Sequence, residues 1–174
     1  PQLRNRDYVG NSNNGYWLSN PATPLEGFPT IMGPLGYEGT QQFLRTRIGH
    51  LMVEERKQAT DGLSETPLFD LETLKGLMYS NRVHAAEITL DDVLDICGDF
   101  LTNPVNLIDA ETFDALTRTC DVLDAWDRRV NVDSRGAQVF TEFWGGKQDF
   151  LDELSMSEKW DYINSVSYNQ YLVD

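Results

Sequence analysis

The part of the sequence that decides the fold is Asp7-Tyr8-Val9-Gly10-Asn11-Ser12-Asn13-Asn14-Gly15-Tyr16-Trp17-Leu18-Ser19-Asn20-Pro21. It begins with residues that favour strands, changes to short polar side chains, and returns to aromatic residues before Asn20-Pro21. This pattern predicts a short strand that ends in a polar turn. The turn holds three Asn and one Ser within four positions, and each carboxamide offers two donors and one acceptor without a charge.

Two interpretations of this polar turn are open. Asn and Gly tolerate the positive φ angles of a tight turn, so the cluster can simply be the turn that its composition favours. Alternatively, an uncharged donor fixed at a strand end can stabilise the negative oxygen that develops during acyl transfer. Composition alone favours the turn interpretation.

Length and composition limit the class of protein. The chain has 174 residues, which is about one domain and enough to bury roughly 70% of its unfolded surface. A hydrophobic content of 40%, with aromatic residues along the whole chain, favours a packed globule over a disordered chain. The formal charge of −14 argues against nucleic acid as a partner, because phosphate backbones require clustered Lys and Arg. No apolar run approaches the length of about 18 residues that a membrane span needs.

Residues 21–39 predict a long ordered loop, because Pro and Gly occur too often there for regular elements. Four apolar residues are expected to anchor this loop to a surface: Phe28, Ile31, Met32 and Leu35. Loops of this length and order are often functional.

Apolar residues recur at helical spacing in four later segments, 40–52, 71–79, 90–98 and 110–126. Asp70 is placed to cap the second of these helices, and Thr89 with Asp92 resembles a capping box that opens the third. The residues expected to face the core are Leu44, Ile48, Leu51, Met52, Leu71, Leu74, Leu77, Met78, Leu90, Val93, Leu94, Cys97, Phe113, Leu116, Cys120 and Leu123. Each stripe is interpreted as core and not as a cofactor site.

A further helix is expected from near Gly136, capped by Asp133 or Ser134, and Gly145-Gly146 is expected to end it. Residues 131–142 also match parts of a calcium-loop template. Arg135, however, stands where the ion needs an oxygen ligand, so no metal is predicted. Beyond this point, residues 145–174 alternate acidic and aromatic side chains and predict one or two short helices.

Two groups of residues resemble the penicillin amidase superfamily of N-terminal-nucleophile hydrolases. The first is Arg6-Asp7-Tyr8-Val9-x-Asn11-Ser12-Asn13-Asn14-x-x-Trp17-Leu18-x-Asn20-Pro21-x-x-Pro24-Leu25-x-Gly27-Phe28. The second is Trp126-Asp127, followed by Asn131-x-Asp133-Ser134, Gly136 and Val139-Phe140-x-x-Phe143-Trp144. Within the superfamily, the resemblance is to the branch of acyl-homoserine-lactone acylases and aculeacin A acylase.

The resemblance implies a fold class for the chain. It is expected to be a mainly α fragment, with a short N-terminal strand and a long ordered loop, of an αββα N-terminal-nucleophile hydrolase. Residues 1–144 would be a helical portion from the C-terminal side of the catalytic chain, with the active-site strand and turn at residues 7–15. For the tail, residues 145–174, the resemblance predicts no architecture.

The same resemblance implies roles for individual residues. In these enzymes the second Asn of an Asn-x-Asn element donates to the tetrahedral oxyanion, which here is Asn13. An Arg-x-Arg pair follows, and its first Arg lies at the active site. This implies Arg45, with Arg47 as the alternative. The non-functional interpretation is that both Arg residues simply lie on a solvated helix face. Trp17, from the motif, is assigned with Arg45 to substrate binding.

The family nucleophile is a Ser at the amino terminus of the large chain, and its own α-amino group is the base. This chain begins with Pro1, so the expected partners are the remaining chain or chains that carry that Ser, together with a small N-acylated substrate. Neither nucleic acid nor a membrane is expected as a partner, and no cofactor is expected.

Cys97 and Cys120 lie on the apolar faces of consecutive predicted helices, so an antiparallel hairpin would bring them together. In the resembled acylases, cysteines at these two places form a disulfide. The alternative is two buried free thiols. A disulfide implies a periplasmic or extracellular location.

The implied activity is hydrolysis of the amide bond of N-acyl-homoserine lactones, lipopeptides or β-lactams through an acyl-enzyme. Two other classes remain open: a non-catalytic acidic helical interaction module, and a small enzyme that acts alone. The second is disfavoured because no nucleophile–base pair can be identified in the sequence. Zinc motifs and Gly-x-Ser-x-Gly are absent, and His50 and His84 stand alone.

Overall fold

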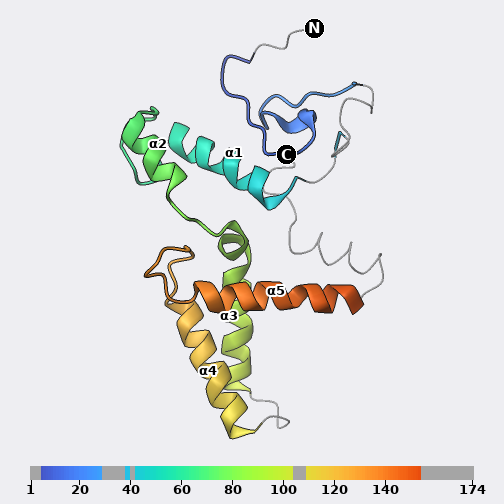
Figure 1. Ribbon diagram of the computed structural model, residues 1–174, viewed down its shortest axis with the longest axis vertical. Coiled ribbons are helices and arrows are strands. Elements are labelled where there is room, and N and C mark those ends of the chain that lie inside the picture. The colour runs from blue at the N-terminus through green and yellow to red at the C-terminus, as the bar shows by residue number, and fades with distance from the viewer. Residues whose placement is uncertain (1–4, 29–37, 40–41, 104–108, 154–174) are drawn as a thin grey trace. The chain divides into compact units, whose positions relative to one another are not determined.

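The computed structural model describes residues 5–28, 38–39, 42–103 and 109–153, with side chains as far as residue 145 (Figure 1). Their regular structure is a 3₁₀ helix and five α-helices: η1 (Tyr16–Leu18), α1 (Leu44–Lys57), α2 (Leu71–Met78), α3 (His84–Thr102), α4 (Ala110–Asp124) and α5 (Ala137–Glu153). The mainly α prediction is confirmed. The described residues form two compact units, one that ends at Tyr79 and one that begins at Ser80. No helix in the described ranges is long and apolar enough to span a membrane.

The strand predicted before the polar turn is not formed within the described residues. A strand needs a neighbouring strand for its backbone groups, and here a buried side chain takes that place. Asn20 is 2% exposed, and its Nδ2 donates to the Tyr8 carbonyl at 2.9 Å and to Asp7 Oδ2 at 3.2 Å. The Gly10 amide then donates to the Ser19 carbonyl, which closes residues 10–19 into a loop around η1.

Helix α1 differs from its prediction in both its ends and its buried face. It begins at Leu44 and continues to Lys57, and the apolar residues expected in its core are only half-buried. Its buried residues are polar: Thr46, Arg47, His50 and Arg56. The reason is that α1 packs against polar loops, whose side chains and carbonyls supply the hydrogen bonds that buried polar groups require.

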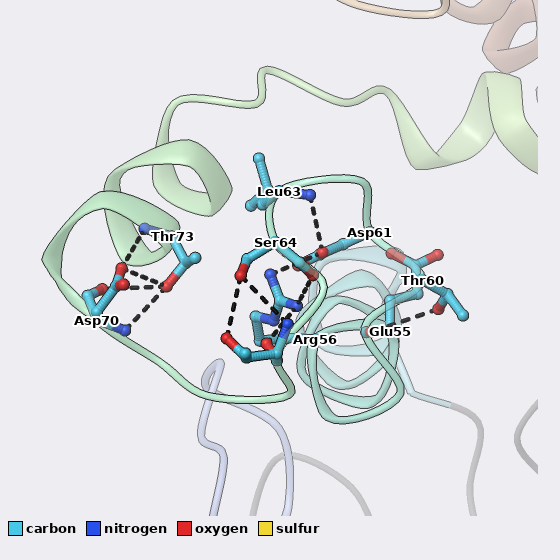
Figure 2. Close-up of polar contacts among 9 residues, drawn as sticks. Glu55, Arg56, Thr60, Asp61, Leu63, Ser64, Asp70 and Thr73 are labelled. Atoms are coloured by element: carbon cyan, nitrogen blue, oxygen red, sulfur yellow. Dashed lines mark hydrogen bonds and ion pairs between the residues drawn. The ribbon is translucent and has the colours of Figure 1, made fainter.

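Arg56 fastens the loop that follows α1 (Figure 2). Its guanidinium is fully buried, donates to the carbonyls of Ser64 and Thr66 at 2.6 and 2.8 Å, and pairs with Asp61 at 2.9 Å. The Asp61 side chain is itself 3% exposed. One planar cation therefore ties three points of the loop to the end of α1.

Helix α2 is capped as predicted by Asp70. The Asp70 side chain accepts from the Thr73 amide at 2.8 Å, while the Thr73 hydroxyl accepts from the Asp70 amide at 2.9 Å (Figure 2). This reciprocal pair is a capping box. The predicted core stripe is wrong in this unit, because only Leu77 is buried, whereas Leu71 and Met78 are 65% and 68% exposed. Among the described residues, no helix packs extensively against α2.

The second unit is a helical hairpin crossed by a third helix (Figure 1). Helices α3 and α4 pack together and are joined by the Cys97–Cys120 disulfide, with a Cα–Cα distance of 5.9 Å. The predicted cysteine pairing is confirmed. Closing a loop of this length contributes about 3 kcal/mol in the chain-entropy account.

The predicted capping box at the start of α3 is wrong. The helix begins five residues earlier than Thr89, at His84, because His84-Ala85-Ala86-Glu87 contains strong helix formers. Inside the helix, the Thr89 hydroxyl donates to the Ala85 carbonyl at 2.7 Å, a bond that lets a Thr occupy a helix interior.

The segment between α4 and α5 is held by Trp126. This residue is 5% exposed, and its Nε1 donates to the Arg129 carbonyl at 2.8 Å. A Cβ at Gly136, where φ is +105°, would lie 2.6 Å from Trp126 Cβ, so only Gly fits there. The prediction that Asp133 or Ser134 caps α5 is wrong, because α5 begins at Ala137 and the residue before it is Gly136. The Ser134 hydroxyl instead donates to Asp127 Oδ2 at 2.9 Å, which braces the segment from within.

Helix α5 runs through Gly145-Gly146 to Glu153, so the prediction that these glycines end the helix is wrong. Gly costs about 1 kcal/mol relative to Ala in a helix interior, which weakens a helix without forbidding it. The predicted anchors Ile31, Met32 and Leu35, and the tail helices beyond residue 153, lie outside the described residues.

Replacing Arg56 with Met should lower the free energy of unfolding by about 3–5 kcal/mol, because Asp61 would be left as a buried charge without its partner. Denaturant unfolding of the purified protein, followed by circular dichroism, measures this change. The control is Lys75→Met, which breaks an exposed pair with Glu72 and should cost at most about 1 kcal/mol. Equal effects of the two substitutions would contradict the assigned role of Arg56.

Candidate functional site

The candidate site is the Asn-rich loop, residues 11–14, lying against the first turns of α1. Both segments belong to the unit that ends at Tyr79. The loop is fixed by three side chains of α1, those of Arg45, Thr46 and His50. Each of the three Asn residues in the loop makes a different contact and so has a different role.

Asn11 folds the loop. Its Oδ1 accepts from the Asn13 amide at 2.8 Å, which is the side-chain-to-backbone bond of an Asx turn. Asn13 then adopts φ of +63°, a left-handed conformation that Asn tolerates better than most residues with a Cβ. The turn interpretation of this cluster is therefore correct, and it leaves the Asn13 side chain free for another role.

Arg45 orients the Asn13 carboxamide. One guanidinium nitrogen, Nη2, donates to the Ser12 carbonyl at 2.7 Å and to Asn13 Oδ1 at 3.2 Å. A guanidinium has donors only, so it fixes the oxygen of the carboxamide on the Arg45 side. The Nδ2 group consequently points away from Arg45, and among the described residues it has no hydrogen-bond partner. Asn13 and Arg45 are both exposed.

Asn14 fixes the loop to the start of α1. Its Oδ1 accepts from the Phe43 amide at 3.3 Å and from the Thr46 hydroxyl. Phe43 is the N-cap residue of α1 and has no side chain that can cap the helix. The Asn14 carboxamide therefore supplies an acceptor at a helix end that lacks one of its own.

His50 supports the chain on the other side of the loop. It is 5% exposed, its Nδ1 lies 3.2 Å from the Tyr8 hydroxyl in a hydrogen bond, and its ring fills the space next to Gly10. Burial lowers the pKa of His50, so the imidazole is neutral at pH 7. A neutral imidazole can accept from Tyr8 without leaving a buried charge.

Lys57 ties the beginning of the segment to the end of α1. Its ammonium donates to Asp7 Oδ2 at 2.8 Å and lies 5.4 Å from the centre of the Tyr8 ring. This hydrogen bond lowers the pKa of the Asp7 carboxyl. Residues 7–14 thus contact α1 along the whole length of the helix, from Arg45 near its start to Lys57 at its end.

Glu38 holds the chain that leaves η1. Its carboxylate accepts from the Tyr16 hydroxyl and from the amides of Gly27 and Phe28, the latter two at 2.8 and 2.9 Å. The hydrogen bond from Tyr16 is the main cause of a lowered pKa at Glu38. The carboxylate therefore stays ionised and fixes residues 27–28 beside Tyr16.

The structure brings together only part of the predicted set of site residues. Asn13 and Arg45 are in contact, which favours Arg45 over Arg47, because Arg47 is 7% exposed and lies on the buried face of α1. Trp17 is 4% exposed and packs inside the loop, so it does not share the exposed surface of Asn13. The cysteines lie in the other unit.

Sequence reasoning missed Asn14, Thr46 and His50 as parts of this site. Thr46 directly follows Arg45, and His50 lies four positions after Thr46, which places Thr46 and His50 on one face of a helix. That spacing was available once Arg45 was chosen. Among the described residues, no group of His, Cys, Asp and Glu could hold a metal ion.

The unit that begins at Ser80 contains an apolar groove of about 630 Å³ between α3, α4 and α5, with Phe100, Leu116 and Phe143 in its walls. Its few polar side chains include Gln138 and Glu142. A site for chemistry needs convergent polar groups, and the loop on α1 has them whereas this groove does not.

Replacing Gly10 with Ala should displace the loop, because the new Cβ would lie 2.9 Å from His50 Cε1. We expect the free energy of unfolding to fall by about 1–3 kcal/mol, as in other overpacked positions, and chemical denaturation measures it. Gly98→Ala is the control, since its Cβ would meet open space within α3, and it should stabilise by up to about 1 kcal/mol. The account of His50 is contradicted if Gly10→Ala is as harmless as Gly98→Ala.

Comparison with known proteins gives consistent matches. The penicillin amidase family model matches residues 1–171, beyond Trp144, where the sequence motifs end. The chain is 40% identical over 152 residues to aculeacin-A acylase of Actinoplanes utahensis, covering 87% of this chain and 18% of that protein. It is 31% identical to acyl-homoserine lactone acylase PvdQ of Pseudomonas savastanoi pv. phaseolicola over 138 residues, 77% of this chain and 15% of the relative. The chain therefore spans less than a fifth of the length of these relatives.

Proposed function

Since the chain belongs to the penicillin amidase family, we propose that it is part of an acylase that hydrolyses the amide bond of N-acylated small molecules. In this proposal its contribution is Asn13, which donates a hydrogen bond to the substrate oxygen in the transition state. The wider αββα fold and the nucleophile belong to parts of the enzyme outside the given residues.

The observation that carries the proposal is the contact between Arg45 and Asn13 Oδ1 at 3.2 Å. It fixes the carboxamide so that Nδ2, a donor, faces away from the helix. The positive charge on Arg45 also polarises the carboxamide, because hydrogen bonds in a chain strengthen one another. A fixed, polarised and uncharged donor suits an oxyanion, since it needs no reorganisation when the charge develops.

The proposed reaction is acyl transfer to a Ser at the amino terminus of a chain segment outside these residues. The Ser oxygen attacks the amide carbon, its proton passes to the α-amino group, and the carbonyl oxygen becomes negative as Asn13 Nδ2 donates to it. Collapse of this intermediate expels the amine, which leaves protonated. Water then hydrolyses the acyl-enzyme by the same sequence.

The substrate class is proposed from the relatives. Aculeacin-A acylase and acyl-homoserine lactone acylase are named for N-acylated substrates, and we propose the same class here: N-acyl-homoserine lactones, lipopeptides or β-lactams. A periplasmic or extracellular location is also proposed, supported by the Cys97–Cys120 disulfide, because such bonds persist in oxidising compartments.

In the assembled acylase, Asn13→Ala should lower kcat at least about tenfold and by up to about 10³, the range for a lost oxyanion donor. KM should change little, because the interaction forms mainly in the transition state. Asn13→Asp is the sharper variant. It keeps the shape and the acceptor for Arg45, but an ionised carboxylate cannot donate, so its kcat should fall at least as far.

Steady-state kinetics with amide substrates of differing acyl length measure both variants, with circular dichroism to show that the fold is retained. Unchanged turnover in Asn13→Asp would remove the catalytic assignment. An acidic interaction module, the alternative function, would show no amide hydrolysis in any assembly.

The proposed partner gives a second prediction. Intact-mass analysis of the protein purified from its source should find that these residues belong to, or travel with, a polypeptide whose first residue is Ser. A complete assembly in which no chain begins with Ser would contradict the proposed nucleophile.

A further inference from the structure

We propose that Asn14 and Thr46 form a positioning pair that sets the direction of the Asn13 carboxamide. This inference rests on the proposed function, because it assigns a role in aiming the same donor. Neither residue would touch the substrate. Each would act through Asn13.

Two pairs of adjacent residues join the loop to α1. Asn13 and Asn14 are adjacent on the loop, and Arg45 and Thr46 are adjacent on α1. Arg45 meets Asn13 and Thr46 meets Asn14, so the loop and the helix are joined by two contacts side by side. Because Asn13 and Asn14 are joined by a rigid planar peptide, a displacement of Asn14 is expected to displace Asn13 as well.

The two contacts differ in burial. Asn13 and Arg45 are exposed, so water competes for their hydrogen bond and its net contribution is small. Thr46 is 4% exposed, and its hydroxyl donates to Oδ1 of the half-buried Asn14. Losing one partner of a buried hydrogen bond leaves the other unsatisfied, which costs more than losing an exposed bond. The Asn14–Thr46 contact, which is more buried than the Arg45–Asn13 contact, is therefore the better able to fix the loop.

Asn14 also completes the start of α1. Its Oδ1 accepts from the amide of Phe43, 29 residues later in the chain, where the helix has no capping side chain of its own. One oxygen thereby joins the loop to the helix backbone and to the Thr46 side chain together. The position of Asn13 therefore depends on the backbone of α1 as well as on the flexible side chain of Arg45.

His50 and Tyr8 also fix this segment, but they act at residues 8–10, before the Asx turn. Their contacts support the approach to the loop. The Asn14–Thr46 contact follows Asn13 directly, and so it controls the residue that presents the donor.

The experiment uses Thr46→Val in the assembled acylase, because Val keeps the shape of Thr and removes the hydroxyl. With the hydrogen bond lost, kcat should fall about fivefold to tenfold, with KM within about twofold. Thr46→Ser restores the donor and should recover most of kcat. Thr141→Val is the control: its hydroxyl donates to the Ala137 carbonyl within α5, and kcat should not change.

A double-mutant cycle separates positioning from general damage. If Thr46 acts through Asn13, then Thr46→Val should cause no further loss of kcat in the Asn13→Ala background. An equal fall in kcat in both backgrounds would overturn the proposal, as would wild-type kcat in Thr46→Val. If Thr46→Val does not accumulate as processed enzyme, Asn14→Ala replaces it in the same cycle, with the same two criteria.

The same cycle distinguishes failure of the proposed function from failure of the positioning role. If Asn13→Ala alone leaves kcat unchanged, the proposed function fails. If Asn13→Ala lowers kcat while Thr46→Val and Asn14→Ala do not, only the positioning role fails.

Discussion

The structure of the candidate site depends on hydrogen bonds that join the Asn-rich loop to one face of α1. Asn13 has a φ of +63°, and its carboxamide can act as a catalytic donor only if the NH₂ group, and not the oxygen, faces the substrate. Arg45 sets this orientation, because a guanidinium cannot accept a hydrogen bond and so binds the oxygen. A loop of small polar residues has no hydrophobic core to fix it. Its order comes from α1, which presents Arg45, Thr46, His50 and Lys57 to it in succession.

This constraint explains why α1 is an unusual helix. Its buried face is polar, at a cost in desolvation that the loops offset by supplying acceptors and donors. Arg56 repeats the principle at the other end of the helix, where it binds the following loop through two carbonyls and Asp61 (Figure 2). Polar side chains of α1 therefore hold the loops on either side of the helix, whereas the α3–α4 hairpin is held by apolar packing and a disulfide.

The sequence predicted the features that depend on local chemistry or on a family motif. The helical segments, the Asp70 cap, the Cys97–Cys120 pairing and the contact of Arg45 with Asn13 are of this kind. It failed where tertiary contacts decide. Asn20 replaced a strand partner, Thr89 entered a helix instead of capping it, and α2 left its apolar side exposed. Thr46 and Asn14 were missed because their contact joins positions 32 residues apart.

The central claim is that Asn13 Nδ2 is aimed at a substrate oxygen while Arg45 holds Oδ1. The most direct measurement is a crystal structure of the assembled acylase with a tetrahedral transition-state analogue bound. The account predicts that Asn13 Nδ2 lies within about 3 Å of the analogue's oxyanion position and that the Arg45 contact with Oδ1 is retained. A bound analogue whose oxygen is met by other donors, with the Asn13 side chain turned away, would contradict it.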